Sequence, residues 1–454
     1  MSIFGLSRRI TIMKHTLRKT SVKSLASLLG CFLLVNGLAF AANSEGSEST
    51  SWFDGVLDGI ESAVMKSGLV GLKDGLREKH GLQIKPFLKT GVDFTDNAFH
   101  APKSNEKPDT IWKFTPGLQF RHDGDYGAIG GAYEAPFRYF GKYGAQNAQD
   151  QAFLVYTDLK PVKDIYIRAS DQFKYEEATA GSPLAKKITY VDNNVSTLVG
   201  KLQGAWAYEA GFQLLDRDFK TTVADMYSSA ETKYDGRVKY HLKDGEVYGG
   251  GRIGYVNFNK IDTRDTIYFE VPVGYEGKLP WYGLTTSAMV GFHHRNQTAQ
   301  GRNNWTNVVT DLLVEKRFNS NRTVVSTGFL RRPVESTFST ATIYDERSWE
   351  ASVKHLITSK LRGRLITRLS TNKYPDTVNA GNRVVVAGTT VVLIAPPAPV
   401  KRFDEVFDIG VGFDYSVRKW LILHLDYEFS RRNSNISSLD YTDNTLSIHT
   451  TIPL

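Results

Sequence analysis

The stretch that decides the fold lies near the end of the chain, where apolar and polar residues alternate one by one. Residues 407–418 read Phe-Asp-Ile-Gly-Val-Gly-Phe-Asp-Tyr-Ser-Val-Arg, and residues 421–430 read Leu-Ile-Leu-His-Leu-Asp-Tyr-Glu-Phe-Ser. Successive side chains of a β-strand point to opposite faces, so each segment has one apolar and one polar face. Residues 446–454 repeat the pattern with Leu, Ile, Thr, Ile and Leu at alternate positions. The end of the chain is therefore predicted to form three long amphipathic strands.

The same alternation extends back to Leu82. It is clear in residues 165–170, 206–214 and 267–275, and turn sequences such as Lys243-Asp244-Gly245 and Asn319-Ser320-Asn321 separate such segments. The segments are longer than the ~5–6 residues of a usual globular strand. Mean hydropathy is −0.30, and no apolar run reaches the ~18 residues that a membrane-spanning helix needs. These features exclude a multi-helix membrane protein and favour a membrane β-barrel, which turns its apolar face to lipid and has no open edge.

Residues 82–454 are therefore predicted to form an all-β, antiparallel, up-and-down transmembrane β-barrel. At ~20 residues for each strand and its connection, this length gives about 18 strands, with 16 as the main alternative. An even number of strands places both termini in the periplasm. Residues 176–187 are expected to form an external loop, and residues 375–402 a long outer loop or a hairpin beyond the membrane. Aromatic residues near the predicted strand ends are expected to form interfacial girdles: Trp112, Tyr126, Tyr139, Tyr282, Trp305, Trp349 and Trp420.

Residues 1–41 have the features of an export signal. Six basic residues precede an apolar stretch from Leu25 to Phe40, and Ala39-Phe40-Ala41 fits a cleavage site. An uncleaved anchor and a lipoprotein box at Cys31 are the alternatives, the latter disfavoured because the apolar run continues beyond the cysteine. Cleavage after Ala41 would remove the only cysteine and lower the formal net charge from +8 to +2. The basic composition therefore gives no reason to expect nucleic-acid binding.

Residues 42–81 are predicted to form a periplasmic N-terminal segment. Apolar residues recur at helical spacing from Phe53 to Val64, whereas several glycines weaken a helix here. A plug for the barrel, an amphipathic contact element and a frayed linker all stay open as interpretations.

Three groups of residues resemble the β-barrel porin 2 family of bacterial outer-membrane proteins. The first is Gly91-Val92-Asp93-Phe94-Thr95-Asp96-Asn97-Ala98-Phe99 with Lys107-Pro108-Asp109 and Phe114-Thr115-Pro116-Gly117-Leu118. The second is Phe137-Arg138-Tyr139-Phe140 with Asp150-Gln151, and the third joins residues 426–435 to Asp440-Tyr441-Thr442-Asp443-Asn444. The resemblance spans the barrel but departs from the family at Leu454, where the usual terminal residue is aromatic. It implies a porin or a protein of exopolysaccharide production, and it carries over no catalytic residue.

Two motifs that suggest other chemistry are better explained by strand structure. Gly249-Gly250-Gly251-Arg252-Ile253-Gly254 fits a dinucleotide-binding pattern, but it lies inside a predicted strand rather than between a strand and a helix. His293 and His294 are adjacent, so a strand would point them to opposite faces and they could not share a metal ion. No cofactor, metal site or enzymatic activity is therefore expected, and a barrel hydrolase is the least favoured function.

The polar face of the strands supplies the candidate site, which is the wall of the lumen. Side-chain parity on the last strands predicts a basic wall beside an acidic one, or alternatively a set of charges that pair and fill the barrel. The candidate lumen-facing residues are Arg168, Arg252, Glu350, Lys354, Arg362, Arg364, Arg368, Asp408, Asp414, Asp426 and Glu428.

The sequence therefore predicts a porin-like channel in the outer membrane of a Gram-negative bacterium, for passive diffusion of small hydrophilic solutes. An exopolysaccharide export conduit and a closed structural barrel are the alternatives. The expected partners are outer-membrane lipid, lipopolysaccharide, the barrel-assembly machinery and small solutes or polysaccharide. Nucleic acid is not expected, and the oligomeric state is left open.

Overall fold

A computed structural model describes residues 81–178, 188–221, 227–260, 264–279, 282–297, 304–335, 343–378, 385–387, 390–392 and 400–454. The predicted signal with Cys31, and the segment 42–81 apart from its last residue, lie outside this part of the chain. Among the described residues, no helix is long and apolar enough to cross a membrane.

The described residues are almost all in long β-strands, which the alternating sequence and the separating turns produce. The strands are β1 (Leu82–Thr95), β2 (Asp109–Gly124), β3 (Gly127–Glu134), β4 (Phe137–Phe140), β5 (Ala148–Gln149), β6 (Gln151–Val162), β7 (Ile165–Ala178), β8 (Ile188–Gln203), β9 (Trp206–Phe219), β10 (Ser229–His241), β11 (Gly245–Phe258), β12 (Thr266–Leu279), β13 (Leu284–Gln297), β14 (Trp305–Phe318), β15 (Thr323–Glu335), β16 (Ile343–Leu356), β17 (Leu361–Val378), β18 (Val385–Ala387), β19 (Thr390–Val392), β20 (Val400–Arg418), β21 (Leu421–Ser434) and β22 (Tyr441–Pro453).

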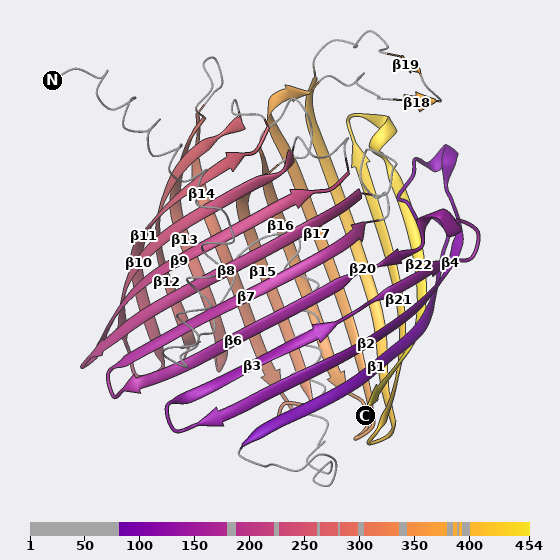
Figure 1. The fold of residues 1–454 in the computed structure, drawn as a ribbon. Coiled ribbons are helices and arrows are strands. Elements are labelled where there is room, and N and C mark those ends of the chain that lie inside the picture. Colours follow the sequence, from indigo (N-terminus) through magenta and orange to yellow (C-terminus); the bar gives the residue numbers. More distant parts are fainter. Residues whose placement is uncertain are drawn as a thin grey trace, which may run out of the picture.

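These strands form a closed antiparallel barrel of 18 strands, as the sequence predicts (Figure 1). Two strands of the barrel are each divided into two segments. β3 and β4 form one of them, since both pair with β2, and β5 and β6 form the next, since they pair with β4 and β3. Pro136 lies between β3 and β4, and it cannot donate a backbone hydrogen bond to a neighbouring strand. The first and last strands close the barrel, since β1 pairs with β22 from Phe87↔Pro453 to Thr95↔Thr445.

The two ends of the barrel differ in their connections. One end carries short turns, such as those between Gly124 and Gly127 and between Phe318 and Thr323. Residues 319–321 in the second turn all have positive φ angles, in agreement with the predicted Asn-Ser-Asn turn. β1 begins and β22 ends at this same end, and longer connections lie at the other (Figure 1). We call these the turn end and the loop end.

The two faces of the barrel wall differ in chemistry. Large apolar side chains on the outward face stay exposed, among them Trp112 at 58%. The inward face carries most of the charged side chains, and many of them are buried against one another, such as Asp93 at 5% exposed and Glu134 at 1%. The described residues therefore bury polar networks inside the barrel and present an apolar surface outside, the reverse of a soluble protein.

The boundaries of two predicted loops differ from the structure. β7 continues to Ala178 and β8 begins at Ile188, so the first loop is shorter than predicted and its residues lie outside the described part. β17 continues to Val378 and β20 begins at Val400, with the small β18–β19 hairpin between them. A hairpin is thus present in the predicted 375–402 region, but the flanking barrel strands extend further into it.

The predicted aromatic girdle is wrong at two positions. Trp305 opens β14 but lies on the inward face, opposite Arg295, and only 9% of it is exposed. Trp349 faces outward but lies in the middle of β16 rather than at its end. β14 has apolar residues on both faces, at Val308 and Val309 and again at 312 and 313, so alternation alone could not assign its faces.

The glycine-rich stretch lies inside β11, as predicted, and one of its glycines makes room for an aromatic ring. Gly254 is paired with Tyr268 on β12, and a Cβ atom at Gly254 would lie 2.1 Å from the tyrosine ring. The hydroxyl of Tyr268 donates to Glu231 Oε1 at 2.7 Å, so the ring is anchored at its far end and cannot easily move away.

Gly254→Ala is therefore expected to destabilise the barrel by about 2 kcal/mol, because the ring must shift away from its position. Urea unfolding of the barrel in lipid vesicles measures the effect. Gly251→Ala is the matched control, since a Cβ atom there meets nothing within 4 Å. Equal stability of the two variants would contradict this account of Gly254.

Candidate functional site

Nine of the eleven candidate residues lie on four neighbouring strands, β16, β17, β20 and β21. Their registers place them on one face: Glu350 is opposite Arg368, which is opposite Asp408, and Arg362 is opposite Asp414. The opposite face of the same strands carries the exposed Trp349, Leu365 and Leu369. The nine residues therefore face the interior together, and we call this surface the charged wall. Its members are Glu350, Lys354, Arg362, Arg364, Arg368, Asp408, Asp414, Asp426 and Glu428.

The basic and acidic parts of the charged wall are joined by an ion pair that crosses one strand. Arg364 on β17 donates to Asp426 Oδ1 on β21 at 2.6 Å, although β20 lies between them. Gly412 of β20 is opposite both residues in register, and a Cβ atom there would lie 2.2 Å from Asp426 Oδ1. The absence of a side chain at Gly412 thus lets the arginine reach over β20.

A second arginine of the wall pairs with Glu346, a residue that is not among the predicted lumen-facing residues. Arg368 donates to Glu346 Oε1 at 2.6 Å, and Arg332 of β15 donates to the other oxygen at 3.2 Å. Glu346 is almost fully buried, so two guanidinium groups stabilise a carboxylate that is withdrawn from water. Glu346 lies four residues before Glu350 on β16, so the alternation places both on the inward face. Extending the predicted inward-facing residues toward the start of this strand would have included Glu346.

The acidic strands of the wall contain paired and exposed carboxylates. Asp414 contacts His424 Nδ1 at 2.7 Å, and the other ring nitrogen of His424 contacts Thr451 Oγ1 at 3.1 Å. Glu428, in contrast, is exposed, as are Glu350 and Lys354. The charged wall therefore combines a cross-linked framework with charges that reach solvent inside the barrel.

The two remaining candidates lie on other parts of the inward face. Arg168 on β7 forms a 3.5 Å ion pair with Asp158, and both side chains are partly exposed. Arg252 on β11 forms a 3.3 Å pair with Glu270, which also contacts His293 Nδ1 at 3.0 Å. The structure does not bring these two arginines to the charged wall, and they belong to separate polar groups.

His293 and His294 point to opposite faces, as their adjacency on a strand predicts. His293 is buried inside between the rings of Tyr268 and Trp305, at centroid distances of 4.9 and 5.4 Å, whereas His294 contacts Thr306 and Asn296 on the outward face. Within the described ranges, no group of three or more His, Cys, Asp or Glu residues is placed to hold a metal ion.

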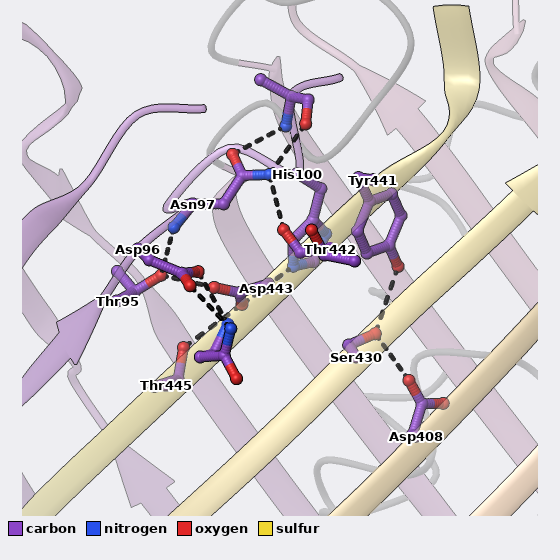
Figure 2. Close-up of polar contacts among 12 residues, drawn as sticks. Thr95, Asp96, Asn97, His100, Asp408, Ser430, Tyr441, Thr442, Asp443 and Thr445 are labelled. Carbon is purple, nitrogen blue, oxygen red and sulfur yellow. Dashed lines mark hydrogen bonds and ion pairs between the residues drawn. The ribbon is translucent and has the colours of Figure 1, made fainter. Parts of the chain in front are cut away.

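The charged wall continues to the loop end through a polar cluster at the closing seam of the barrel (Figure 2). Ser430 donates to Asp408 at 2.6 Å and lies 3.4 Å from the Tyr441 hydroxyl. The ring of His100, in the β1–β2 connection, stacks on Tyr441 at 4.4 Å and its Nε2 lies 3.5 Å from Asp443. The loop after the first strand is thereby fixed to the last strand, β22, beside the wall.

Comparison with solved structures finds outer-membrane proteins of low sequence identity. They include OpdK of Pseudomonas aeruginosa, solved with vanillate, at 11% identity and a TM-score of 0.45, and the BenF-like porin of Pseudomonas fluorescens Pf-5, at 10% and 0.44. OccAB3 of Acinetobacter baumannii matches at 12% and 0.44. Each alignment covers 82% of this chain and 99% of the other chain.

No family model matches the chain, and no curated protein matches it. The resemblance to the β-barrel porin 2 family therefore stays a prediction. These structural similarities are too weak to indicate a function for this chain.

Proposed function

We propose that the chain is a porin-like channel through which small hydrophilic solutes diffuse passively. The observation that carries the proposal is the exposure of Glu350, Lys354 and Glu428 on the inward face of a closed 18-strand barrel. Charged side chains that stay exposed inside a barrel need water around them. Barrels of about 16–18 strands are wide enough to hold an aqueous channel.

We place this channel in the outer membrane of a Gram-negative bacterium. The exposed apolar residues of the outward face match the surface that a barrel presents to lipid. Bacterial barrels have short periplasmic turns and longer external loops, so the turn end would face the periplasm together with the first and last strand ends. The predicted export signal fits this location. The barrel-assembly machinery, membrane lipid and lipopolysaccharide are the partners that it implies.

Conductance of the purified barrel in planar lipid bilayers tests the proposal. We expect stable conductance steps with modest ion selectivity, because the charged wall carries both signs. The measurement is made with and without residues 43–81, and a larger conductance of the shortened chain would identify this segment as a plug. Absence of conductance in both forms would reject the channel and favour a closed structural barrel.

An exopolysaccharide export conduit is the second candidate, and the arginine row of β17 favours it. Arg362, Arg364 and Arg368 lie on one face and could contact an acidic polymer. Two of them are already paired with carboxylates, however, which reduces the positive charge that a polymer would meet. Deletion of the gene should then abolish surface polymer, and unchanged polymer would eliminate this function.

A further inference from the structure

Among the polar side chains on the outward face of β6, β7 and β8, three share one feature in a region that should contact lipid. They are Thr157, Asp171 and Asn193, and each has a buried side-chain oxygen without a hydrogen-bond partner among the described residues. Their outward direction follows from the registers: Asp171 is opposite Val155 and Val195, and Asn193 is opposite the exposed Phe173. We call these three residues the polar stripe.

The polar stripe runs along the barrel axis. Thr157 is opposite Ala169, and Asp171 lies two residues further toward the loop end. Asp171 is in turn opposite Val195, and Asn193 again lies two residues further toward the loop end. From Thr157 to Asp171, and again from Asp171 to Asn193, the stripe therefore moves to the neighbouring strand and two residues toward the loop end. With strands about 4.8 Å apart and tilted by about 40°, the sideways components of these movements nearly cancel. The front of the barrel in Figure 1 shows this tilt, with β6, β7 and β8 successively higher.

Such a stripe is unfavourable against hydrocarbon. Asp171 lies at the middle of β7, far from both ends of the strand. Lipid tails offer no hydrogen bonds, so an ionisable group at this depth points to a functional contact rather than to a lipid contact. The stripe is flanked by apolar residues, including Ile129, Val155 and Phe173 on one side. A polar line inside an apolar surface is the composition expected of a protein interface.

The structure supplies a hydrogen-bond donor that matches Asp171. Tyr133 of β3 faces outward and is 40% exposed. Its depth follows from the registers, since Asp171 is opposite Val155, Val155 is opposite Gly131, and Tyr133 lies two residues beyond Gly131 toward the loop end. Moving two strands across, from β7 to β3, lowers the position along the barrel axis. Moving two residues toward the loop end raises it by nearly the same amount when the strands are tilted by about 40°. Tyr133 and Asp171 therefore lie at nearly the same depth, on either side of Val155 and Phe173.

We propose that a second copy of this chain docks on the outward face of β3, β6 and β7. This inference rests on the barrel spanning a membrane, which gives all copies the same orientation and makes their symmetry axis parallel to the barrel axis. A two-fold axis through the Val155 and Phe173 region brings Asp171 of each copy to Tyr133 of the partner subunit. The tyrosine hydroxyl donates to the carboxylate in both directions, so one surface is complementary to itself. The apolar residues between them meet at the centre of the interface.

Cysteine cross-linking in isolated outer membranes tests the position of the axis. Phe173→Cys places a thiol near the axis, and mild oxidation should yield a disulfide-linked species of twice the protomer mass. Phe269→Cys is the matched control, an outward phenylalanine of β12 in a different part of the barrel that should not cross-link. The unsubstituted chain, whose only cysteine is Cys31, gives the baseline. A monomeric Phe173→Cys, or a cross-link to a different protein, would overturn the proposal.

Native mass spectrometry in lipid nanodiscs tests the hydrogen bond itself. Tyr133→Phe keeps the ring but removes both symmetry-related donors, and should weaken the dimer at least about tenfold. Tyr255→Phe removes the hydroxyl of an exposed outward tyrosine on β11 and should change nothing. A dimer unaffected by Tyr133→Phe, or a wild-type chain that is monomeric in nanodiscs, would rule out this interface. Conductance is independent of this readout, so a failed dimer does not affect the proposed channel.

Discussion

Arg364→Asp is expected to make the channel clearly cation-selective. In the wild-type wall Arg364 neutralises Asp426 at 2.6 Å, and the pair contributes little net charge to the lumen. The substitution removes the positive charge, adds a negative one and leaves Asp426 without its partner, beside Asp414 and the exposed Glu428. Fixed charge on the wall of a water-filled pore attracts counter-ions and repels co-ions. We expect the ratio of cation to anion permeability to rise about fivefold, given potentials of several kT from such clusters.

The reversal potential under a potassium chloride gradient measures this ratio. Arg431→Asp is the matched control, because it makes the same charge change on β21 but on the outward face. Arg431 is opposite Phe407 of β20 in the strand register. Arg364→Asp combined with Asp426→Arg restores the pair with its ends exchanged and should restore the selectivity. An unchanged reversal potential in a conducting Arg364→Asp barrel would show that the charged wall does not line the path of the ions.

The strand faces could be predicted from the sequence because they depend on a local rule. Alternation along β20 and β21 assigns Asp408, Asp414 and Glu428 to one face whatever the rest of the chain does. The strand number followed from length for the same reason, since each strand and its turn consume a similar number of residues. Where both faces of a strand are apolar, as in β14, the rule does not assign the faces, and the prediction that Trp305 faces the membrane interface is wrong.

The side-chain partners could not be predicted from the sequence, because they depend on register and on what the intervening strand leaves open. Arg364 pairs with Asp426 only because β20 presents Gly412 between them. Arg368 is opposite Glu350 in register, yet its guanidinium reaches the buried Glu346 instead. The contacts of His100 depend on the path of a loop, for which alternation carries no information. A sequence can therefore give the charges of such a wall, but not which of them are neutralised.

The closing seam gives the largest expected effect on stability. Asn97, just after β1, is fully buried at 0% exposed. Its Nδ2 donates to the backbone oxygens of Ala101 at 2.7 Å and Thr442 at 2.8 Å, and its Oδ1 accepts from the Ala101 amide at 2.9 Å. One side chain thus fixes the β1–β2 loop on itself and ties it to β22, the last strand of the barrel (Figure 2).

Asn97→Ala is therefore expected to lower the free energy of unfolding by about 3 kcal/mol, since each buried group that loses its partner costs about 1–3 kcal/mol and water can replace some of the bonds. Urea unfolding in lipid vesicles measures the loss. Asn97→Asp replaces both donors with a carboxylate oxygen that faces the carbonyl oxygens of Ala101 and Thr442 in a buried site, so it should be at least as unstable as the alanine variant. Asn257→Ala, at an exposed position of β11, should stay within about 0.5 kcal/mol of the wild type. If Asn97→Ala is no less stable than Asn257→Ala, the seam is held by the β1–β22 strand pairing alone and the loop contributes nothing to closing the barrel.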